Sequence, residues 1–266
     1  MAIKTALGPK LTVNDIPMAA LRCTTRHTVI MPNKPPLILL PAIPCDGRFY
    51  ASQIEGLSDL VEAETLLFES IDIRENAASV LAQAPSRFLL AGTAYGGCLA
   101  LEIALIAPER IAGLWLMNCN PGSNPSPTEA LAICARIRAG GLDQVLDEWA
   151  EVIVDPQNSG ARDEFLLMAR EAGAERFANQ YEASARRHDH WDDLKTIAVP
   201  TLLLWGQDDR FVPMSIGRSM SDKIRDVHLV ELANCRHFPT LECPTLATKA
   251  ARAWVLRCMA NESHPM

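Results

Sequence analysis

Short apolar runs alternate with amphipathic stretches along most of this chain. Nearly uninterrupted apolar runs are typical of strands buried inside a parallel sheet, whereas apolar residues at every third or fourth position are typical of helices. Strands that alternate with helices predict an α/β fold with a doubly wound, mostly parallel sheet. The expected strands are residues 37–40, 66–68, 88–91, 111–117, 199–205 and 227–232, and the expected helices are 47–60, 76–83, 97–107, 215–224 and 244–259, with an opening hairpin in residues 11–23.

The stretch from residue 121 to residue 194 has a different character, because strand patterns are absent and amphipathic helices follow one another. Its first helix starts at a capping box, Ser-Pro-Thr-Glu at residues 126–129, and is expected to end at Gly140 and Gly141. Further helices are expected at 145–153, 165–172 and 177–187. We therefore expect a core of residues 1–120 and 195–266, with residues 121–194 as an all-helical lid over the carboxyl edge of the sheet, where ligands of such sheets bind.

Composition narrows the possible partners. The 266 residues suit one large α/β domain with an insertion, or two small domains, and the 48% hydrophobic content is ample for a core. The net charge is −7 and there is no run of Lys or Arg, so nucleic acid and anionic membrane surfaces are not expected as partners. No apolar stretch has the length of a membrane span or of a signal-peptide core.

The eight cysteines predict neither a disulfide framework nor a metal site. None forms a C-x-x-C motif and none pairs with a histidine at zinc-ligand spacing, while several lie in apolar stretches. Reduced, buried thiols in a cytoplasmic protein are the expectation. No flavin, nicotinamide or phosphate motif is evident either, so we expect no cofactor and no metal.

The most informative segment is Gly92-Thr93-Ala94-Tyr95-Gly96, which joins an apolar strand to an apolar-striped helix. It resembles the nucleophile elbow G-x-S-x-G of the α/β-hydrolase family, with Ala94 where the attacking serine is expected. The two glycines are expected because side chains there would collide as strand and helix close together. A tight strand-to-helix turn without catalysis would have the same local pattern.

Two later segments resemble the same family in the order nucleophile, acid, histidine. A strand followed by Gly206-Gln-Asp-Asp209 places the acid at Asp209, and the adjacent Asp208 is expected to be solvated. His237, before a Leu-Glu-x-Pro segment that starts the last helix, takes the place of the histidine. The resemblance implies that His237 is a general base and that Asp209 fixes its tautomer.

The resemblance also implies an oxyanion hole. One backbone N–H donor would come from Tyr95, at the start of the helix after the elbow, and the other from Ile43, by its position in the loop after the first buried strand. Many relatives have His-Gly where this chain has Pro41-Ala42. Weaker candidates for substrate contact are Arg48, Trp149, Tyr181 and Trp191, for which packing or solvation is an equally simple interpretation.

A member of this family is expected to cleave a small or medium organic ester, lactone, thioester or amide by a Ser-His-Asp mechanism, or a C–C bond with the same three residues. Ala94 leaves three interpretations open. We favour an inactive form of a serine hydrolase in which the serine has been replaced. The others are a nucleophile-free lyase or cofactor-free enzyme that uses His237 as a base, and a ligand-binding module on the same fold. The substrate and the oligomeric state cannot be predicted from the sequence.

Overall fold

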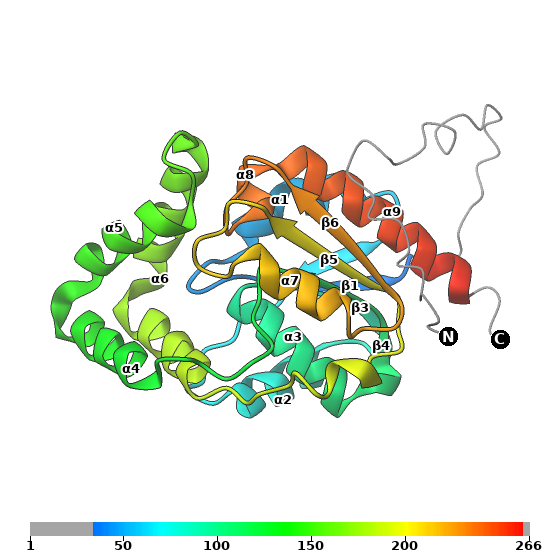
Figure 1. The fold of residues 1–266 in the computed structure, drawn as a ribbon, viewed down its shortest axis with the longest axis horizontal. Coiled ribbons are helices and arrows are strands. Elements are labelled where there is room, and N and C mark those ends of the chain that lie inside the picture. The colour runs from blue at the N-terminus through cyan, green and yellow to red at the C-terminus, as the bar shows by residue number, and fades with distance from the viewer. Residues whose placement is uncertain (1–33, 263–266) are drawn as a thin grey trace, which may run out of the picture.

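The computed structural model describes residues 34–262 (Figure 1). Six strands in this part form one sheet in the order β2-β1-β3-β4-β5-β6, and every neighbouring pair is parallel. The predicted parallel sheet is thus confirmed, whereas the expected hairpin in residues 11–23 lies outside the described residues. The strands are β1 (Pro36–Leu40), β2 (Glu62–Thr65), β3 (Phe88–Thr93), β4 (Ile111–Met117), β5 (Thr201–Gly206) and β6 (Val227–Leu232).

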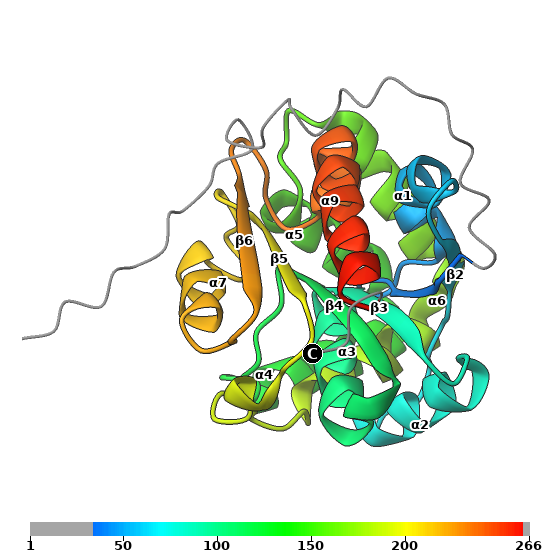
Figure 2. The same cartoon turned by 90° about the vertical axis from the view of Figure 1, so that its right-hand side faces the viewer.

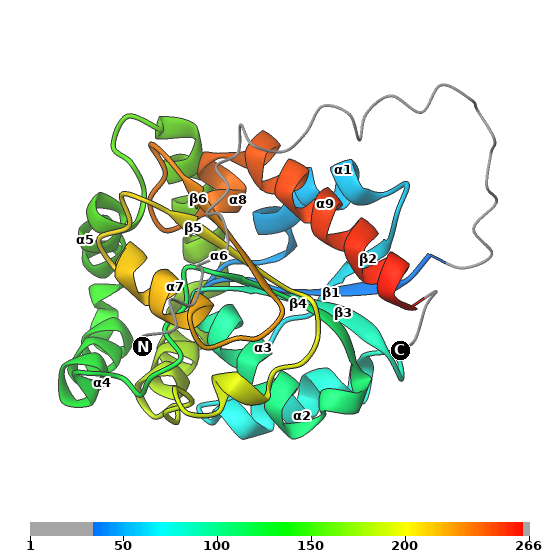
Figure 3. The same ribbon diagram turned by 45° about the vertical axis from the view of Figure 1, so that its right-hand side comes forward.

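Helices cover both faces of the sheet, which is why its central strands are apolar throughout. Helices α1 (Ala51–Leu57) and α9 (Pro244–Glu262) cover one face, and α2 (Ile73–Gln83) and α3 (Tyr95–Ile106) cover the other (Figures 2 and 3). Every residue of β3, β4 and β5 is buried between these layers. Helix α7 (Met214–Ser221) packs against β5 and β6. Among the described residues, no helix is long and apolar enough to cross a membrane.

The chain between β4 and β5 is helical and lies beyond the carboxyl ends of the strands, on the left of Figure 1. It comprises α4 (Pro127–Arg136), a π-helical turn at Ile137–Gly141, α5 (Leu142–Ile153) and α6 (Ser159–Ala185). We call these elements the helical insert. Two glycines with positive φ interrupt it, Gly140 at 95° and Gly173 at 81°. The second break divides α6 into the two helices that the sequence predicts.

Two local expectations were wrong, and one short helix was not expected. The strand expected at residues 66–68 lies earlier, at β2, because a polar strand at the sheet edge, with alternating exposed and half-buried residues, has no apolar run. Helix α4 begins at Pro127 as predicted, but the Ser126 side chain makes no capping hydrogen bond. The short helix α8 (Pro239–Glu242), between the histidine and the last helix, was not predicted.

The strand order places a crevice where the first motif lies. Strand β1 pairs with β2 on one side and with β3 on the other, and Leu40 is the register partner of Gly92. After β1 the chain continues to α1 on one face, and after β3 it continues to α3 on the other face. Such a reversal of direction opens a crevice at the carboxyl ends of the two strands, where open α/β sheets bind ligands.

Candidate active site

Ala94 has the backbone conformation of a nucleophile elbow although it carries no nucleophile. It joins β3 to α3 with φ 55° and ψ −119°. A Cβ on Gly92 would collide with the backbone of Gly96 and Gly97, and one on Gly96 would collide with the carbonyl oxygens of Leu40 and Pro41. The reason given above for the two glycines is therefore confirmed. A non-glycine residue in such a conformation costs about 1–3 kcal/mol.

The hydroxyl of Thr93 does not take the place of the serine hydroxyl that is absent at position 94. Thr93 is fully buried, and its Oγ1 shares a hydrogen bond of 2.8 Å with the hydroxyl of Tyr50. The Tyr50 hydroxyl also donates to the carbonyl oxygen of Leu40, at 2.9 Å. Thr93 thus points into the sheet, as the elbow geometry predicts.

His237 and Asp209 form a buried hydrogen-bonded pair. The distance from His237 Nδ1 to Asp209 Oδ2 is 2.8 Å, and the two side chains are 2% and 0% exposed. Burial opposes the charge of Asp209, but the contacts with His237, Asn118 and the N–H of Val212 outweigh it and hold the pKa of this carboxyl below its usual value. An ionised partner at Nδ1 places the imidazole proton there and leaves Nε2 as the acceptor.

The acid is oriented by two backbone N–H groups of its own loop and by one side chain from another segment. Asp209 Oδ1 accepts the N–H groups of Phe211 and Val212, at 2.7 and 3.0 Å. Asn118, directly after β4 and with φ 43°, donates through Nδ2 to Asp209 Oδ2 and to the carbonyl oxygen of Arg236. Asn118 was not predicted from the sequence, and the signal that indicates it is a polar residue at the carboxyl end of a buried strand. Asp208 is exposed, as expected.

The loop that carries His237, residues 233–238, passes very close to the loop that carries the acid. A Cβ on Gly206 would collide with the carbonyl oxygens of Arg236 and Cys235, so this position requires glycine. Asn234 has φ 53°, a left-handed conformation that asparagine adopts more readily than most non-glycine residues. These contacts fix the distance between acid and histidine through the backbone.

The histidine loop is also joined to the end of α5 in the helical insert. The N–H of His237 donates to the carbonyl oxygen of Ile153, at 3.0 Å. The guanidinium of Arg236 donates to the carbonyl oxygens of Glu151 and Val154, at 2.9 and 3.0 Å, and so caps the C-terminus of the helix. This end of the insert and the histidine therefore form one hydrogen-bonded unit.

Glu242 of α8 strengthens the same junction and was not identified from the sequence. Its carboxylate accepts the N–H groups of Phe238, Asp155 and Arg236, at 2.9, 3.0 and 3.2 Å. Burial raises the pKa of Glu242, and these N–H donors offset only part of that effect. The carboxylate thus connects both sides of His237 to the insert.

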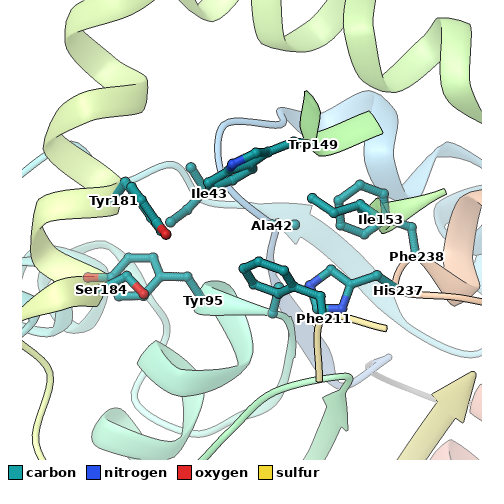
Figure 4. Close-up of a pocket in the computed structure, with 11 residues that line it drawn as sticks. Ala42, Ile43, Tyr95, Trp149, Ile153, Tyr181, Ser184, Phe211, His237 and Phe238 are labelled. Carbon is teal, nitrogen blue, oxygen red and sulfur yellow. The ribbon is translucent and has the colours of Figure 1, made fainter. Parts of the chain in front are cut away.

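A small cavity of about 40 Å³ lies between the elbow, the histidine and the insert (Figure 4). Figure 4 shows the hydroxyls of Tyr181 and Ser184 at one end and Phe211 and Phe238 beside His237 at the other. None of the described residues that line the cavity is Lys or Arg. The lining residues are Ala42, Ile43, Ala94, Tyr95, Trp149, Ile153, Tyr181, Ser184, Phe211, His237 and Phe238.

Most of the predicted site residues meet at this cavity. Ala94, Ile43, Tyr95 and His237 line it, and Asp209 lies behind His237. Tyr95 is the first residue of α3, where backbone N–H groups have no partner within the helix, so a donor is available beside Ala94. The second predicted donor belongs to Ile43, on the loop after β1.

The four weaker candidates divide into two pairs. Trp149 and Tyr181 line the cavity, and their rings pack edge to face with centroids 4.8 Å apart. Arg48 does not line it, because its guanidinium is held by Asp46 and Glu171, at 2.6 and 2.5 Å. Trp191 does not line it either and lies against Gly122 at the base of the insert.

Comparison with known proteins agrees with this geometry. The model of a family described as "Alpha/beta hydrolase family" matches residues 36–251, from β1 into the last helix. The chain belongs to the alpha/beta hydrolase family. In this α/β-hydrolase chain, the match includes positions 94, 209 and 237 together with the whole helical insert.

Individual relatives of this α/β hydrolase include C–C bond hydrolases. It is 28% identical over 213 residues to a 2-hydroxy-6-oxononadienedioate/2-hydroxy-6-oxononatrienedioate hydrolase of Paraburkholderia xenovorans. It is 32% identical over 167 residues to a 2-hydroxy-6-oxo-6-phenylhexa-2,4-dienoate hydrolase of Burkholderia cepacia. These matches cover 74% and 58% of this chain but only 65% and 57% of the two relatives.

Solved structures share the fold at lower identity. The enol-lactonase of Burkholderia xenovorans superimposes with a TM-score of 0.77 at 19% identity, over 84% of this chain and 92% of that one. At this identity the similarity shows the common fold and does not transfer an activity.

Proposed function

We propose that this cavity is a serine-hydrolase site without its nucleophile, and that the present chain binds a small neutral carbonyl compound with little turnover. The observation that carries the proposal is the strained elbow at Ala94, beside a buried His237–Asp209 pair. A strained backbone persists only when the surrounding structure enforces it, and it is concentrated at functional sites. Here the two elbow glycines, the His237–Asp209 pair and the available N–H of Tyr95 all suit a hydroxyl at position 94.

The lining of the cavity favours a neutral substrate. Its walls are mostly aromatic and aliphatic, with the hydroxyls of Tyr181 and Ser184 as polar groups at one end. The substrates named for the C–C hydrolase relatives are dienoates and dioates, which carry carboxylates. A buried carboxylate needs a cationic or hydrogen-bonding partner, and no Lys or Arg of the described residues lines this cavity. We therefore favour a neutral ester, lactone, thioester or amide, with C–C cleavage of a neutral diketone as the alternative reaction of the same residues.

We further propose that residues 121–194 act as a lid that opens for the substrate. Sites for small organic ligands enclose roughly 300–1,000 Å³, whereas this cavity has about 40 Å³, enough for a few water molecules. Gly140 and Gly173 interrupt the insert at positive φ, and nothing lies within 4 Å of where their Cβ atoms would be. Rotation at these two positions would let parts of the insert move, at the cost of some of the packing of α4 and α5 against α6.

A second candidate function uses the histidine alone. His237 and Asp209 are buried and paired although position 94 carries no hydroxyl for the histidine to deprotonate. Because Nε2 of His237 is the free nitrogen, it could remove a proton next to a carbonyl group of a bound ketone. This reaction needs neither a serine nor a cofactor.

The deciding experiment is covalent labelling of the Ala94→Ser variant with a fluorophosphonate, read as intact mass beside the present chain. We expect one adduct on Ala94→Ser and none on the present chain, because only an activated serine reacts. Adding His237→Ala to the serine variant is the matched control and should abolish labelling. Turnover of a neutral ester should rise by about six orders of magnitude with the serine, by analogy with removal of the serine from a protease triad.

Failure of the serine variant would separate the other interpretations. No adduct, with ligand binding intact, would overturn the serine-hydrolase proposal. Deuterium exchange next to the carbonyl group of a ketone, catalysed by the present chain and lost in His237→Ala, would then support the base mechanism. Binding without exchange would indicate a ligand-binding module.

A further inference from the structure

A second cluster of histidine and carboxylate groups lies outside the cavity, where the helical insert returns to the core. Glu102 belongs to α3, and His188 and His190 follow the end of α6. One donor atom from each of these residues lies within 4.8 Å of the other two. The Glu102 side chain is 2% exposed, while His190 is 16% and His188 47% exposed, so the cluster extends from the interior to the surface.

The cluster has the layout of a histidine–carboxylate metal site. His190 Nε2 is 2.7 Å from Glu102 Oε2, and His188 Nδ1 is 3.8 Å from the same oxygen. The other ring nitrogen of His190, Nδ1, is 3.0 Å from Asp193 Oδ2. A carboxylate on the second nitrogen of a ligating histidine is a recurring feature of metal sites, because it fixes the tautomer and the ring orientation.

We infer that Glu102, His188 and His190 bind a divalent ion of the zinc class, oriented by Asp193. Two imidazoles and one carboxylate suit zinc, with water at the fourth position. Tetrahedral zinc with bonds of about 2.0–2.1 Å places its ligand atoms about 3.3 Å apart. Glu102 Oε2 lies 2.7 and 3.8 Å from the two histidine nitrogens, on either side of that value, and all three atoms lie within 4.8 Å of one another, so side-chain rotation would have to bring them to it.

The surrounding charges favour a cation at this place. The Glu102 carboxylate, the acidic ligand of the three, faces both histidines. Asp193 adds a second negative charge. The nearest opposing charge is Arg74, whose Nε is 3.6 Å from the other oxygen of Glu102 and whose side chain is 69% exposed. Oε2 faces the two histidine nitrogens instead, and a bound metal ion would replace the hydrogen bond between Oε2 and His190 Nε2.

Metal at this cluster would fasten both ends of the insert to the helix that carries the elbow. The N–H of His190 donates to the carbonyl oxygen of Pro121, at 2.9 Å, where the insert leaves the core. The guanidinium of Arg187 donates to the carbonyl oxygen of Gly122, also at 2.9 Å. A bound ion would link these two segments, where the insert leaves and rejoins the core, to α3. A ligand that binds only the folded state stabilises that state.

The test is calorimetric titration of the full, chelator-treated chain with Zn²⁺ at pH 7.5. We expect one ion per chain, at least tenfold weaker binding in His188→Gln and in His190→Gln, and binding about 10–100-fold weaker in Asp193→Asn. His228→Asn is the matched control, since His228 lies on β6 away from the cluster, and it should bind as the present chain does. Cys243→Ser should also bind normally, which excludes the half-buried thiol as the ligand.

Absorption spectra with Co²⁺ and thermal unfolding with Zn²⁺ provide a second test, which does not require every variant to fold well. Co²⁺ should give the intense visible bands of a four-coordinate site in the present chain and lose them in His188→Gln, whose half-exposed side chain can change without loss of the fold. Zn²⁺ should raise the midpoint of thermal unfolding of the present chain and not that of His188→Gln. Absence of binding, binding that is unchanged in both histidine variants, or binding lost in Cys243→Ser would overturn the inference.

Discussion

The described residues include two close pairs of a histidine and a carboxylate, one buried and one that reaches the surface, and the difference between them distinguishes a reactive histidine from one that links the insert to the core. His237 and Asp209 are 2.8 Å apart, and Glu102 and His190 are 2.7 Å apart. In the first pair, Nδ1 is the ring nitrogen that has a partner among residues 34–262, and the ring borders the cavity. In the second pair both ring nitrogens of His190 contact carboxylates.

The comparison shows that a short distance between histidine and carboxylate does not identify a catalytic base. A general base needs a nitrogen with a free lone pair that faces the place where the substrate reacts. Nε2 of His237 meets that requirement, whereas His190, between two carboxylates, suits a proton or a metal ion. The four predictions that follow test this distinction, from the largest expected effect to the smallest.

Replacing the two carboxylates by amides should have very different effects on catalysis. In the Ala94→Ser background, Asp209→Asn should lower kcat about 10⁴-fold, because an amide favours the wrong imidazole tautomer. Glu102→Gln in the same background should leave kcat unchanged, since Glu102 does not border the cavity. Initial rates on a neutral ester measure both. An equal loss of kcat in the two variants would contradict the view that only the His237–Asp209 pair takes part in catalysis.

Gly206→Ala should damage the first pair through the backbone. The added methyl would collide with carbonyl oxygens of the histidine loop, which cannot rotate away, so we expect the free energy of unfolding to fall by about 3 kcal/mol. Urea denaturation measures this change, and fluorophosphonate labelling of the serine variant should slow in parallel. Gly160→Ala is the control, because nothing lies within 4 Å of its Cβ, and it should be neutral or slightly stabilising. Equal effects at both glycines would contradict the close approach of the two loops.

Glu242→Gln should weaken the connection between the histidine loop and the helical insert. The carboxylate accepts three backbone N–H groups, whereas an amide has one acceptor oxygen, so the loss should be about 1–3 kcal/mol of unfolding free energy. In the serine background we expect kcat to fall while KM changes little, because Glu242 positions His237 and does not line the cavity. The exposed Glu164→Gln is the control. A change confined to KM would argue against this positioning role.

The pH dependence of stability should distinguish the second pair. The hydrogen bond to Glu102 is the main cause of the raised pKa of His190, burial opposes it, and Asp193 adds to it. A raised pKa in the folded state stabilises the fold fully below the unfolded value of about 6.5, and this contribution is lost as the pH rises through the folded value.

The measurement is urea denaturation of the present chain and His190→Gln in chelator-containing buffer from pH 5.5 to 9. The difference in unfolding free energy should be largest near pH 6 and shrink toward pH 9. Asp209 has the opposite sign, because its lowered pKa gives stability that is present above about pH 4 and lost as the pH falls. A difference for His190 that grew with pH would contradict the assigned charges.

The fold and the three motifs around positions 94, 209 and 237 could be predicted from the sequence because their signals are local. Ala94, Asp209 and His237 each follow a strand within a short motif, and the parallel sheet brings the carboxyl ends of its strands together. Gly92 was predictable for the same reason, since its neighbours Gly96 and Gly97 are close in sequence, whereas Gly96 is required by the close approach of the end of β1. Strand β2 was misplaced because a polar edge strand has no apolar run.

The supporting residues could not be predicted because their partners are distant in sequence. Asn118 and Asp209 are 91 residues apart, and Glu102 and His190 are 88 apart, so no spacing rule connects them. Side-chain direction was equally unpredictable. Arg48 turns back to Asp46, two residues earlier, and so does not reach the cavity that its position near the oxyanion loop suggested.

The backbone of the elbow makes position 94 an exchangeable part. Its conformation is imposed by the two neighbouring glycines and by the strands on either side, and it is present here with a methyl group as the side chain. The identity of that side chain is thus separate from the folding of the chain. A single codon could place a hydroxyl, a thiol or a carboxylate at the same point before the same histidine, so one scaffold offers several chemistries to selection or to a protein engineer.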